Sequence, residues 1–114
     1  MRKTGKLDYL ELPASGKIAG VKEFYSKAFG WKYTDYGPGY SAFEEGLDGG
    51  FDDSISAETA KPLPVLFSEK LEDTLAAVER SGGTIVKPIF SFPGGRRFHF
   101  TDPAGNELAV WSEN

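Results

Sequence analysis

The sequence contains no cysteine, and it has only one histidine and one methionine among its 114 residues. Without cysteine, the chain can form neither a disulfide framework nor a thiolate metal site. No apolar run approaches the length of a membrane-spanning helix, and Met1-Arg2-Lys3 is not followed by the apolar segment of a secretory signal. We therefore expect a cytoplasmic protein with no membrane partner.

An excess of positive charge is also missing, since 13 Lys and Arg residues face 17 Asp and Glu residues and the net charge is -4. The only local basic cluster is Arg96-Arg97. Nucleic-acid affinity rests mainly on cationic contacts with phosphate, so we expect no nucleic-acid partner. A hydrophobic content of 39% and a charged content of 26% are those of an ordinary globular domain.

The first half of the chain predicts a strand, a helix and three further strands. Residues 7–12 alternate like a strand. Ser15 is a candidate N-cap, apolar residues follow it at helical spacing, and Gly30 stands where a helix end favours a left-handed residue. The three further strands are predicted in glycine-punctuated segments, namely residues 31–36, 39–44 and 49–55.

The second half repeats this order. Residues 63–67 predict a strand, and Ser68 is a candidate cap for a helix that ends at Gly82-Gly83. Three strands follow, at residues 84–89, 96–101 and 107–111. An internal repeat is a strong organising signal, because one unit alone leaves a sheet face uncovered. We predict one α+β domain over residues 1–114, with module 1 at about 6–55, a linker at about 56–62 and module 2 at about 63–112.

The last two predicted strands flank Asp102-Pro103-Ala104-Gly105-Asn106, whose residue types favour a tight turn. Phe98, Phe100, Leu108 and Val110 alternate onto one face of this hairpin, and we expect that face to cover a core. The opposite face is polar and aromatic. It carries Arg97, His99, Glu107 and Trp111.

Three segments of the sequence, FYSKAFGW, LEDTLAAVERSGG and GRRFHFTDPAGNELAVW, resemble the vicinal-oxygen-chelate superfamily. This superfamily includes glyoxalase I, extradiol dioxygenases and bleomycin-resistance proteins. The resemblance implies two βαβββ modules whose sheets curl into an open barrel around a ligand cleft, and homodimers are usual in the family. It also turns the polar hairpin face, together with Tyr9, Glu11, Val65 and Phe67, towards that cleft.

Family metal ligands come from the first and the last strand of each module. Carried over by position, three of the four ligand positions fall on Leu7, Leu63 and Ala109, whose side chains cannot coordinate a metal. The fourth lies within residues 49–53, where Asp52 or Asp53 could occupy it. The resemblance therefore implies no family metal site here, and we expect no cofactor. A weak all-carboxylate site would suit Mg²⁺ or Ca²⁺.

Seven side chains are candidates for a site in the cleft. His99 is the only side chain that titrates near neutral pH, and it could exchange protons with a ligand, with Glu11 or Glu107 as its partner. Arg97 suits a carboxylate or phosphate. The candidates are His99 and Glu11 for catalysis, and Tyr9, Phe67, Arg97, Glu107 and Trp111 for ligand binding. Each also has a structural interpretation, His99 as a hydrogen-bonded wall residue and Glu11 as an ion-pair partner of Arg97.

The leading hypothesis is a protein that binds a small organic molecule in the barrel cleft without the family metal. One alternative is a metal-free isomerase or lyase that uses His99 and Glu11. Another is a divalent-metal-dependent enzyme of the lyase or dioxygenase type. Fold alone does not decide among them, so whether the chain is an enzyme stays open.

Overall fold

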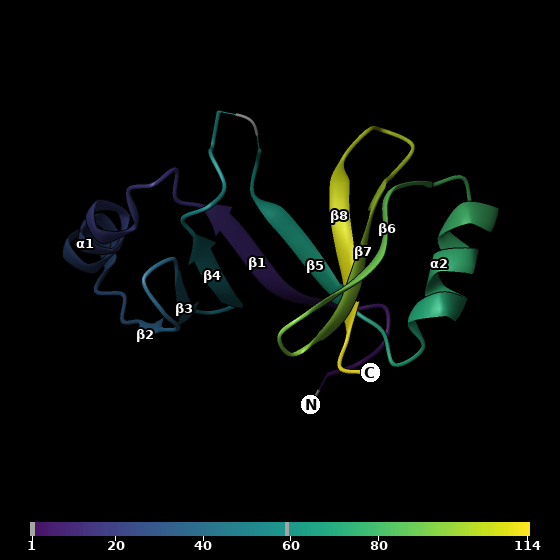
Figure 1. Ribbon diagram of the computed structural model, residues 1–114, viewed down its shortest axis with the longest axis horizontal. Coiled ribbons are helices and arrows are strands. Elements are labelled where there is room, and N and C mark those ends of the chain that lie inside the picture. Colours follow the sequence, from purple (N-terminus) through teal and green to yellow (C-terminus); the bar gives the residue numbers. More distant parts are fainter. Residues whose placement is uncertain (1, 59) are drawn as a thin grey trace. The chain divides into compact units, whose positions relative to one another are not determined.

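The computed structural model describes residues 2–58 and 60–114, which form two helices and eight strands (Figure 1). The order strand, helix and three strands occurs twice, as the sequence predicted. The first set is β1 (Leu7–Pro13), α1 (Ile18–Phe29), β2 (Thr34–Asp35), β3 (Tyr40–Glu44) and β4 (Asp48–Asp52). The second set is β5 (Leu63–Phe67), α2 (Leu71–Arg80), β6 (Thr84–Phe92), β7 (Gly95–Thr101) and β8 (Glu107–Ser112).

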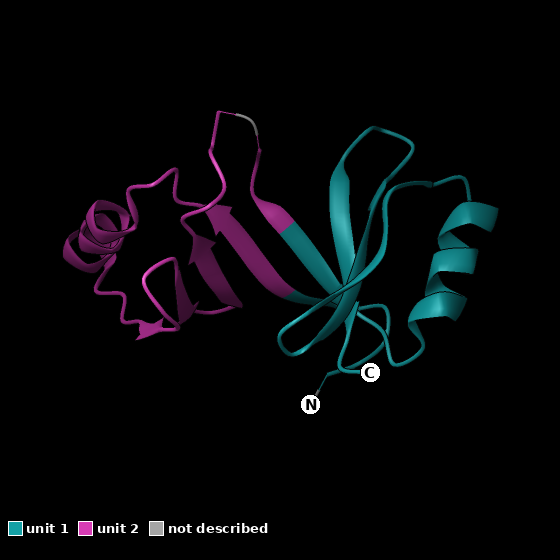
Figure 2. Cartoon of the chain, viewed as in Figure 1, with its two compact units in different colours: residues 1–8, 64–114 teal, residues 9–63 magenta. Residues whose placement is uncertain are grey.

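The chain divides into two compact units (Figure 2). One unit is residues 9–63, and the other joins the residues up to Asp8 with residues 64–114. The predicted linker, 56–62, includes residue 59, which lies outside the described residues. The two sets of elements have the same topology, since the first strand of each pairs in parallel with the last. How the two sheets combine, and hence the expected open barrel, stays a prediction.

In the unit of residues 9–63 the strand order is β2-β3-β4-β1, and α1 packs on one face of this sheet. Strand β3 shows the alternation behind this packing, because Ser41 and Phe43 are buried while Tyr40 and Ala42 are half-buried on the other face. Phe43 and Phe51 lie in the core with ring centroids 5.3 Å apart. The core is built from Ala14, Phe43 and Phe51, with Leu12, Ile18, Val21, Tyr25, Trp31 and Tyr33 packed against it.

Helix α1 ends as predicted but does not begin as predicted. Gly30 takes the left-handed conformation at its C-terminus, with φ of 75°. Ser15 is not the N-cap, because the helix begins at Ile18, and the Ser15 hydroxyl accepts a hydrogen bond from the Ala57 backbone instead. The free N–H of Ile18 donates to Asp53 Oδ1 at 3.0 Å, so a residue distant in sequence caps the helix.

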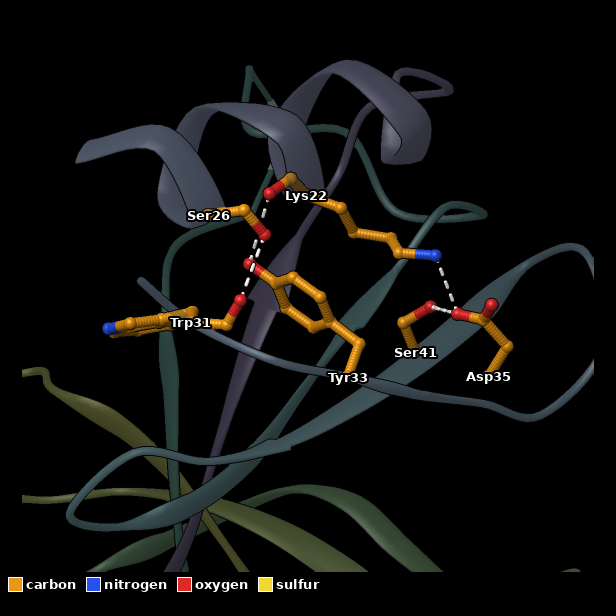
Figure 3. Close-up of polar contacts among 6 residues, drawn as sticks. All are labelled: Lys22, Ser26, Trp31, Tyr33, Asp35 and Ser41. Atoms are coloured by element: carbon orange, nitrogen blue, oxygen red, sulfur yellow. Dashed lines mark hydrogen bonds and ion pairs between the residues drawn. The ribbon is translucent and has the colours of Figure 1, made fainter. Parts of the chain in front are cut away.

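Polar contacts connect α1 with the strands that follow it (Figure 3). The Lys22 ammonium lies 2.6 Å from Asp35 Oδ1, and the Ser41 hydroxyl donates to the same oxygen. These two donors hold the pKa of Asp35 below its usual range. The Tyr33 hydroxyl also donates to the Lys22 carbonyl oxygen at 3.3 Å. Ser26 and Trp31, drawn in the same figure, close the turn after α1 through a 2.9 Å hydrogen bond.

In the second unit the strand order is β5-β8-β7-β6, and α2 contacts β6, β7 and β8. The last hairpin was predicted to cover a core with one face. This prediction is confirmed for Phe98 and Val110, which are buried and pack with Leu71 of α2. Phe100 packs against the same cluster, and Leu108 is half-buried. Neither of the described helices is long and apolar enough to cross a membrane.

Two details of this unit differ from the prediction. Strand β6 continues to Phe92 rather than stopping at residue 89, with two irregularities in its pairing with β7. Ser68 is not the N-cap of α2, because the helix begins at Leu71 and its cap residue is Lys70. The buried Ser68 hydroxyl nevertheless accepts a hydrogen bond from the Lys70 backbone at 3.0 Å.

Candidate functional site

His99 and Glu107 form a hydrogen-bonded pair on the sheet face opposite α2. His99 lies on β7 across from Ala109, and Glu107 lies at the start of β8 across from Thr101. His99 Nδ1 is 2.9 Å from Glu107 Oε2. A carboxylate only accepts hydrogen bonds, so Nδ1 carries the proton and the neutral ring keeps a lone pair on Nε2. Nε2 is buried and has no hydrogen-bond partner among the described residues.

The surroundings of His99 keep its imidazole neutral at pH 7. Burial lowers its pKa, because the imidazolium form loses hydration, and the positive charges of Arg97 and Lys87 act in the same direction. The Glu107 carboxylate opposes this shift without reversing it. A neutral imidazole oriented by a carboxylate can accept a hydrogen bond or a proton at Nε2.

Two aromatic residues of β6, Phe90 and Phe92, lie beside His99 and Arg97. The Phe90 ring centroid is 5.8 Å from that of His99. The Arg97 guanidinium lies over two rings, 5.4 Å from the centroid of Phe90 and 5.7 Å from that of Phe92. Both distances are in the range of cation–π contacts. The sequence prediction missed Phe90 and Phe92 because it ended the strand too early, although Phe90-Ser91-Phe92 continues the alternation.

Trp111 and Phe67 extend the aromatic surface along β8 and β5. Their rings meet edge to face with centroids 5.4 Å apart, and the Phe92 centroid is 6.4 Å from that of Trp111. The Trp111 indole N–H donates a hydrogen bond to Asp8 Oδ2 at 2.9 Å, and this N–H is the only polar group of the indole. The Arg2 guanidinium lies 5.1 Å from the indole centroid. Trp111 therefore offers apolar ring surface.

Tyr9 and Glu11 belong to the unit of residues 9–63, whereas the other five candidates belong to the other unit. The hydroxyls of Tyr9 and Tyr40 form a hydrogen bond, and burial raises the pKa of both. This pair lies over Gly50, where an added Cβ would stand 2.6 Å from the Tyr9 hydroxyl oxygen. Only glycine leaves room for the two hydroxyls there. Glu11, paired with Gly50 across the strands, is buried with 7% exposure.

The Glyoxalase/Bleomycin resistance protein/Dioxygenase superfamily matches residues 6–110 of this sequence. The chain belongs to this superfamily. No curated protein sequence matches it significantly.

Three solved structures are similar in fold to this chain. A structure described as an NAD-dependent benzaldehyde dehydrogenase from Legionella pneumophila has a TM-score of 0.73 at 15% identity, with 91% of this chain and 96% of that chain covered. A Mn(II)-bound glyoxalase from Novosphingobium aromaticivorans has a TM-score of 0.69 at 18% identity. This comparison covers 99% of the present chain but only 40% of the glyoxalase. A superfamily member from Vibrio splendidus has a TM-score of 0.67 at 14% identity, with coverages of 94% and 98%. At these identities the likeness shows the fold alone.

The positions onto which the resemblance places three of the family metal ligands carry apolar side chains. Leu7, Leu63 and Ala109 offer no donor atom, and Ala109 is fully buried. Asp52 Oδ1 accepts hydrogen bonds from the backbone and hydroxyl of Ser54, and Asp53 caps α1. Within residues 2–58 and 60–114, no three His, Asp or Glu side chains come together as a metal-binding group.

Proposed function

We propose that this superfamily member binds a small organic molecule on the sheet face that carries His99, in the barrel cleft expected from its family. The hydrogen-bonded pair of His99 and Glu107 supports this proposal most strongly. A buried nitrogen that lacks a partner is destabilising, and a ligand hydroxyl donating to Nε2 would satisfy it. Aromatic walls with a few oriented polar groups are the usual composition of ligand sites.

The expected ligand has a flat, apolar body and a hydroxyl or enol group. Phe90, Phe92 and Trp111 provide ring surface, while Arg97 adds positive charge on the same face. Phe67, in the same unit as His99, completes the proposed site. Binding requires no metal in this proposal, because the three apolar family positions supply no ligand atoms.

A metal-free isomerase or lyase is the second candidate function. It is favoured by the lowered pKa of His99, which leaves Nε2 unprotonated at neutral pH, and by the carboxylate that orients the ring. Such a base can remove a proton next to a carbonyl group.

A thermal-shift screen of small hydroxy acids, phenols and enols tests the binding proposal. Hits should raise the unfolding temperature of the wild type by mass action and lose most of this effect in His99→Asn. The Asn amide mimics Nδ1 and keeps a donor for Glu107, but it places nothing at Nε2. Hits that stabilise both proteins equally would contradict the proposal. For the second function, turnover of a hit by the wild type but not by His99→Asn is the expected result.

Metal independence and assembly have separate tests. Elemental analysis after incubation with Mg²⁺, Ni²⁺ and Zn²⁺ should find less than one equivalent bound, and one retained equivalent would contradict metal independence. We further propose a cytoplasmic homodimer, since symmetric dimers are the commonest oligomers. Light scattering should give twice the mass of 12.4 kDa.

A further inference from the structure

An apolar cavity lies in the unit of residues 9–63, on the face of its sheet that packs against α1. It has a volume of about 500 Å³, within the range of small-molecule sites. Leu12 and Phe51 line it from the sheet, and Val21, Phe24 and Tyr25 line it from α1. Ala57, Ala60 and Pro62 also line it. None of these residues belongs to the site around His99.

The α1 wall of this cavity is incompletely covered by the rest of the chain. None of the residues of α1 is buried, and the Phe24 side chain is 58% exposed. A large aromatic ring beside an apolar cavity offers surface that a ligand can remove from water.

Two cations line the same cavity. Lys17, at the N-terminal end of α1, and Lys61, before β5, are both among its lining residues. In the described part of the chain, neither ammonium group has an ion pair or a side-chain hydrogen bond. The nearby carboxylate of Asp53 is held by the Ile18 backbone. An apolar cavity with two available ammonium groups matches a ligand with an apolar tail and an anionic head.

We propose that this groove, defined by Leu12, Lys17, Val21, Phe24 and Lys61, binds a medium-chain carboxylate. The tail lies along the apolar wall, and the carboxylate meets Lys17 and Lys61. This site is independent of the His99 face, so the chain has two ligand sites of different chemistry.

Octanoate, decanoate and dodecanoate, each kept below its micelle-forming concentration, are the probes. Titration of the full chain by calorimetry or ¹⁵N NMR should show affinity that rises about fourfold per added methylene, as expected for a buried tail. Decanol should bind more weakly than decanoate, and Lys17→Gln combined with Lys61→Gln should remove that difference. Binding that ignores both chain length and head-group charge would overturn the proposal.

Gly20 provides a variant that fills the groove without disturbing the fold. It is a lining residue inside α1, and a Cβ added there would meet no atom within 4 Å. Gly20→Leu should therefore fold at least as well as the wild type, because leucine favours a helix interior over glycine. We expect it to weaken decanoate binding at least tenfold.

Ala19→Leu is the matched control, since Ala19 is exposed on the same helix and does not line the groove. It should bind decanoate like the wild type. Equal decanoate affinity in Gly20→Leu and Ala19→Leu would overturn the proposal. A homodimer whose interface already protects the groove residues in the absence of carboxylate would also overturn it.

Discussion

At the scale of single residues, the pKa of His99 is the property that most directly tests the electrostatics of the proposed site. It is the only histidine, so its imidazole resonances can be assigned without ambiguity. Its pKa reflects burial, two neighbouring cations and one carboxylate, of which only the last favours the charged form. These contributions have different signs and can be removed one at a time.

The pKa of His99 should move in opposite directions in two variants. Glu107→Gln removes the carboxylate that stabilises the imidazolium form and should lower the pKa further. Lys87→Gln removes a repelling positive charge and should raise it. A pH titration of the His99 Hε1 resonance measures both. Shifts of the same sign in the two variants would contradict the described electrostatics.

The Tyr9–Tyr40 hydrogen bond should be revealed by a double-mutant cycle. Tyr9→Phe or Tyr40→Phe alone leaves the other half-buried hydroxyl without its partner and should destabilise the fold by about 1–3 kcal/mol. The double variant removes both hydroxyls and should lose less than the sum of the single variants. Urea unfolding measures the three differences. Strict additivity would mean that the two hydroxyls do not interact.

Sequence reasoning found part of the site at this scale. It named Glu107 as one of two candidate partners for His99, because the two lie on the same face of a predicted hairpin. It could not find Tyr40, since the proximity of Tyr40 to Tyr9 depends on the register of β3, β4 and β1 and on the bare backbone at Gly50.

At the scale of elements, the start of α1 shows how a distant residue replaces a local cap. Ser15 is the local candidate, but the chain passes through positive φ at Ser15 and Gly16 before the helix begins. Asp53, 35 residues away, supplies the acceptor instead. This contact joins the helix to the end of β4. No local pattern in the sequence encodes it.

Asp53→Ala should destabilise the fold by about 1 kcal/mol, the usual effect of losing an N-cap. Asp53→Asn keeps the acceptor oxygen and should lose much less. Ser15→Ala, which leaves the helix N–H groups untouched, is the control for the rejected local cap. Chemical denaturation compares the three variants. A larger loss in Ser15→Ala than in Asp53→Ala would contradict the assignment.

The elements predicted best were those with a strong local pattern. Residues 63–67 form β5 with the predicted ends, and the last hairpin differs from the prediction by a single residue at one end of each strand. The strand predicted over residues 31–36 shortens to two residues because Trp31 and Tyr33 pack into the core instead of extending the pairing. Tertiary packing overrides the strand propensity of these aromatic residues.

At the scale of the whole molecule, the repeat was the most predictable feature. Because the same order of strands and helix occurs twice, few sheet topologies are possible. In both copies the first strand pairs in parallel with the last. The identity of a ligand could not be predicted in this way. The proposed site depends on side chains such as Phe90, which lies just beyond the strand predicted over residues 84–89.

Folding stability should decline as the pH falls below 6.5, the ordinary pKa of histidine. The folded-state pKa of His99 is lower than this value, so the unfolded chain binds its proton first. The contribution of His99 to the free energy of unfolding is complete above pH 6.5. It is lost as the pH falls towards the folded-state pKa, at no more than about 1.4 kcal/mol per pH unit.

Three carboxylates also have lowered pKa values, namely Asp35, Glu72 and Asp102. Their protonation reduces the folding stability only below their ordinary pKa values of 3.8 to 4.5. The slope between pH 6.5 and 5 should therefore be smaller in His99→Asn than in the wild type. Urea unfolding at several pH values measures it. An unchanged slope would show that His99 does not titrate differently on unfolding.

The most direct test of the proposed function is long-range ¹H–¹⁵N NMR of the His99 imidazole, recorded with and without a ligand from the thermal-shift screen. Before addition, the spectrum should show a neutral ring with its proton on Nδ1. On addition, the Nε2 resonance should move upfield as this nitrogen accepts a hydrogen bond, while added Mg²⁺, Ni²⁺ or Zn²⁺ should leave it unchanged. A ligand whose stabilising effect is lost in His99→Asn, but which does not move the Nε2 resonance of the wild type, would contradict the proposed site.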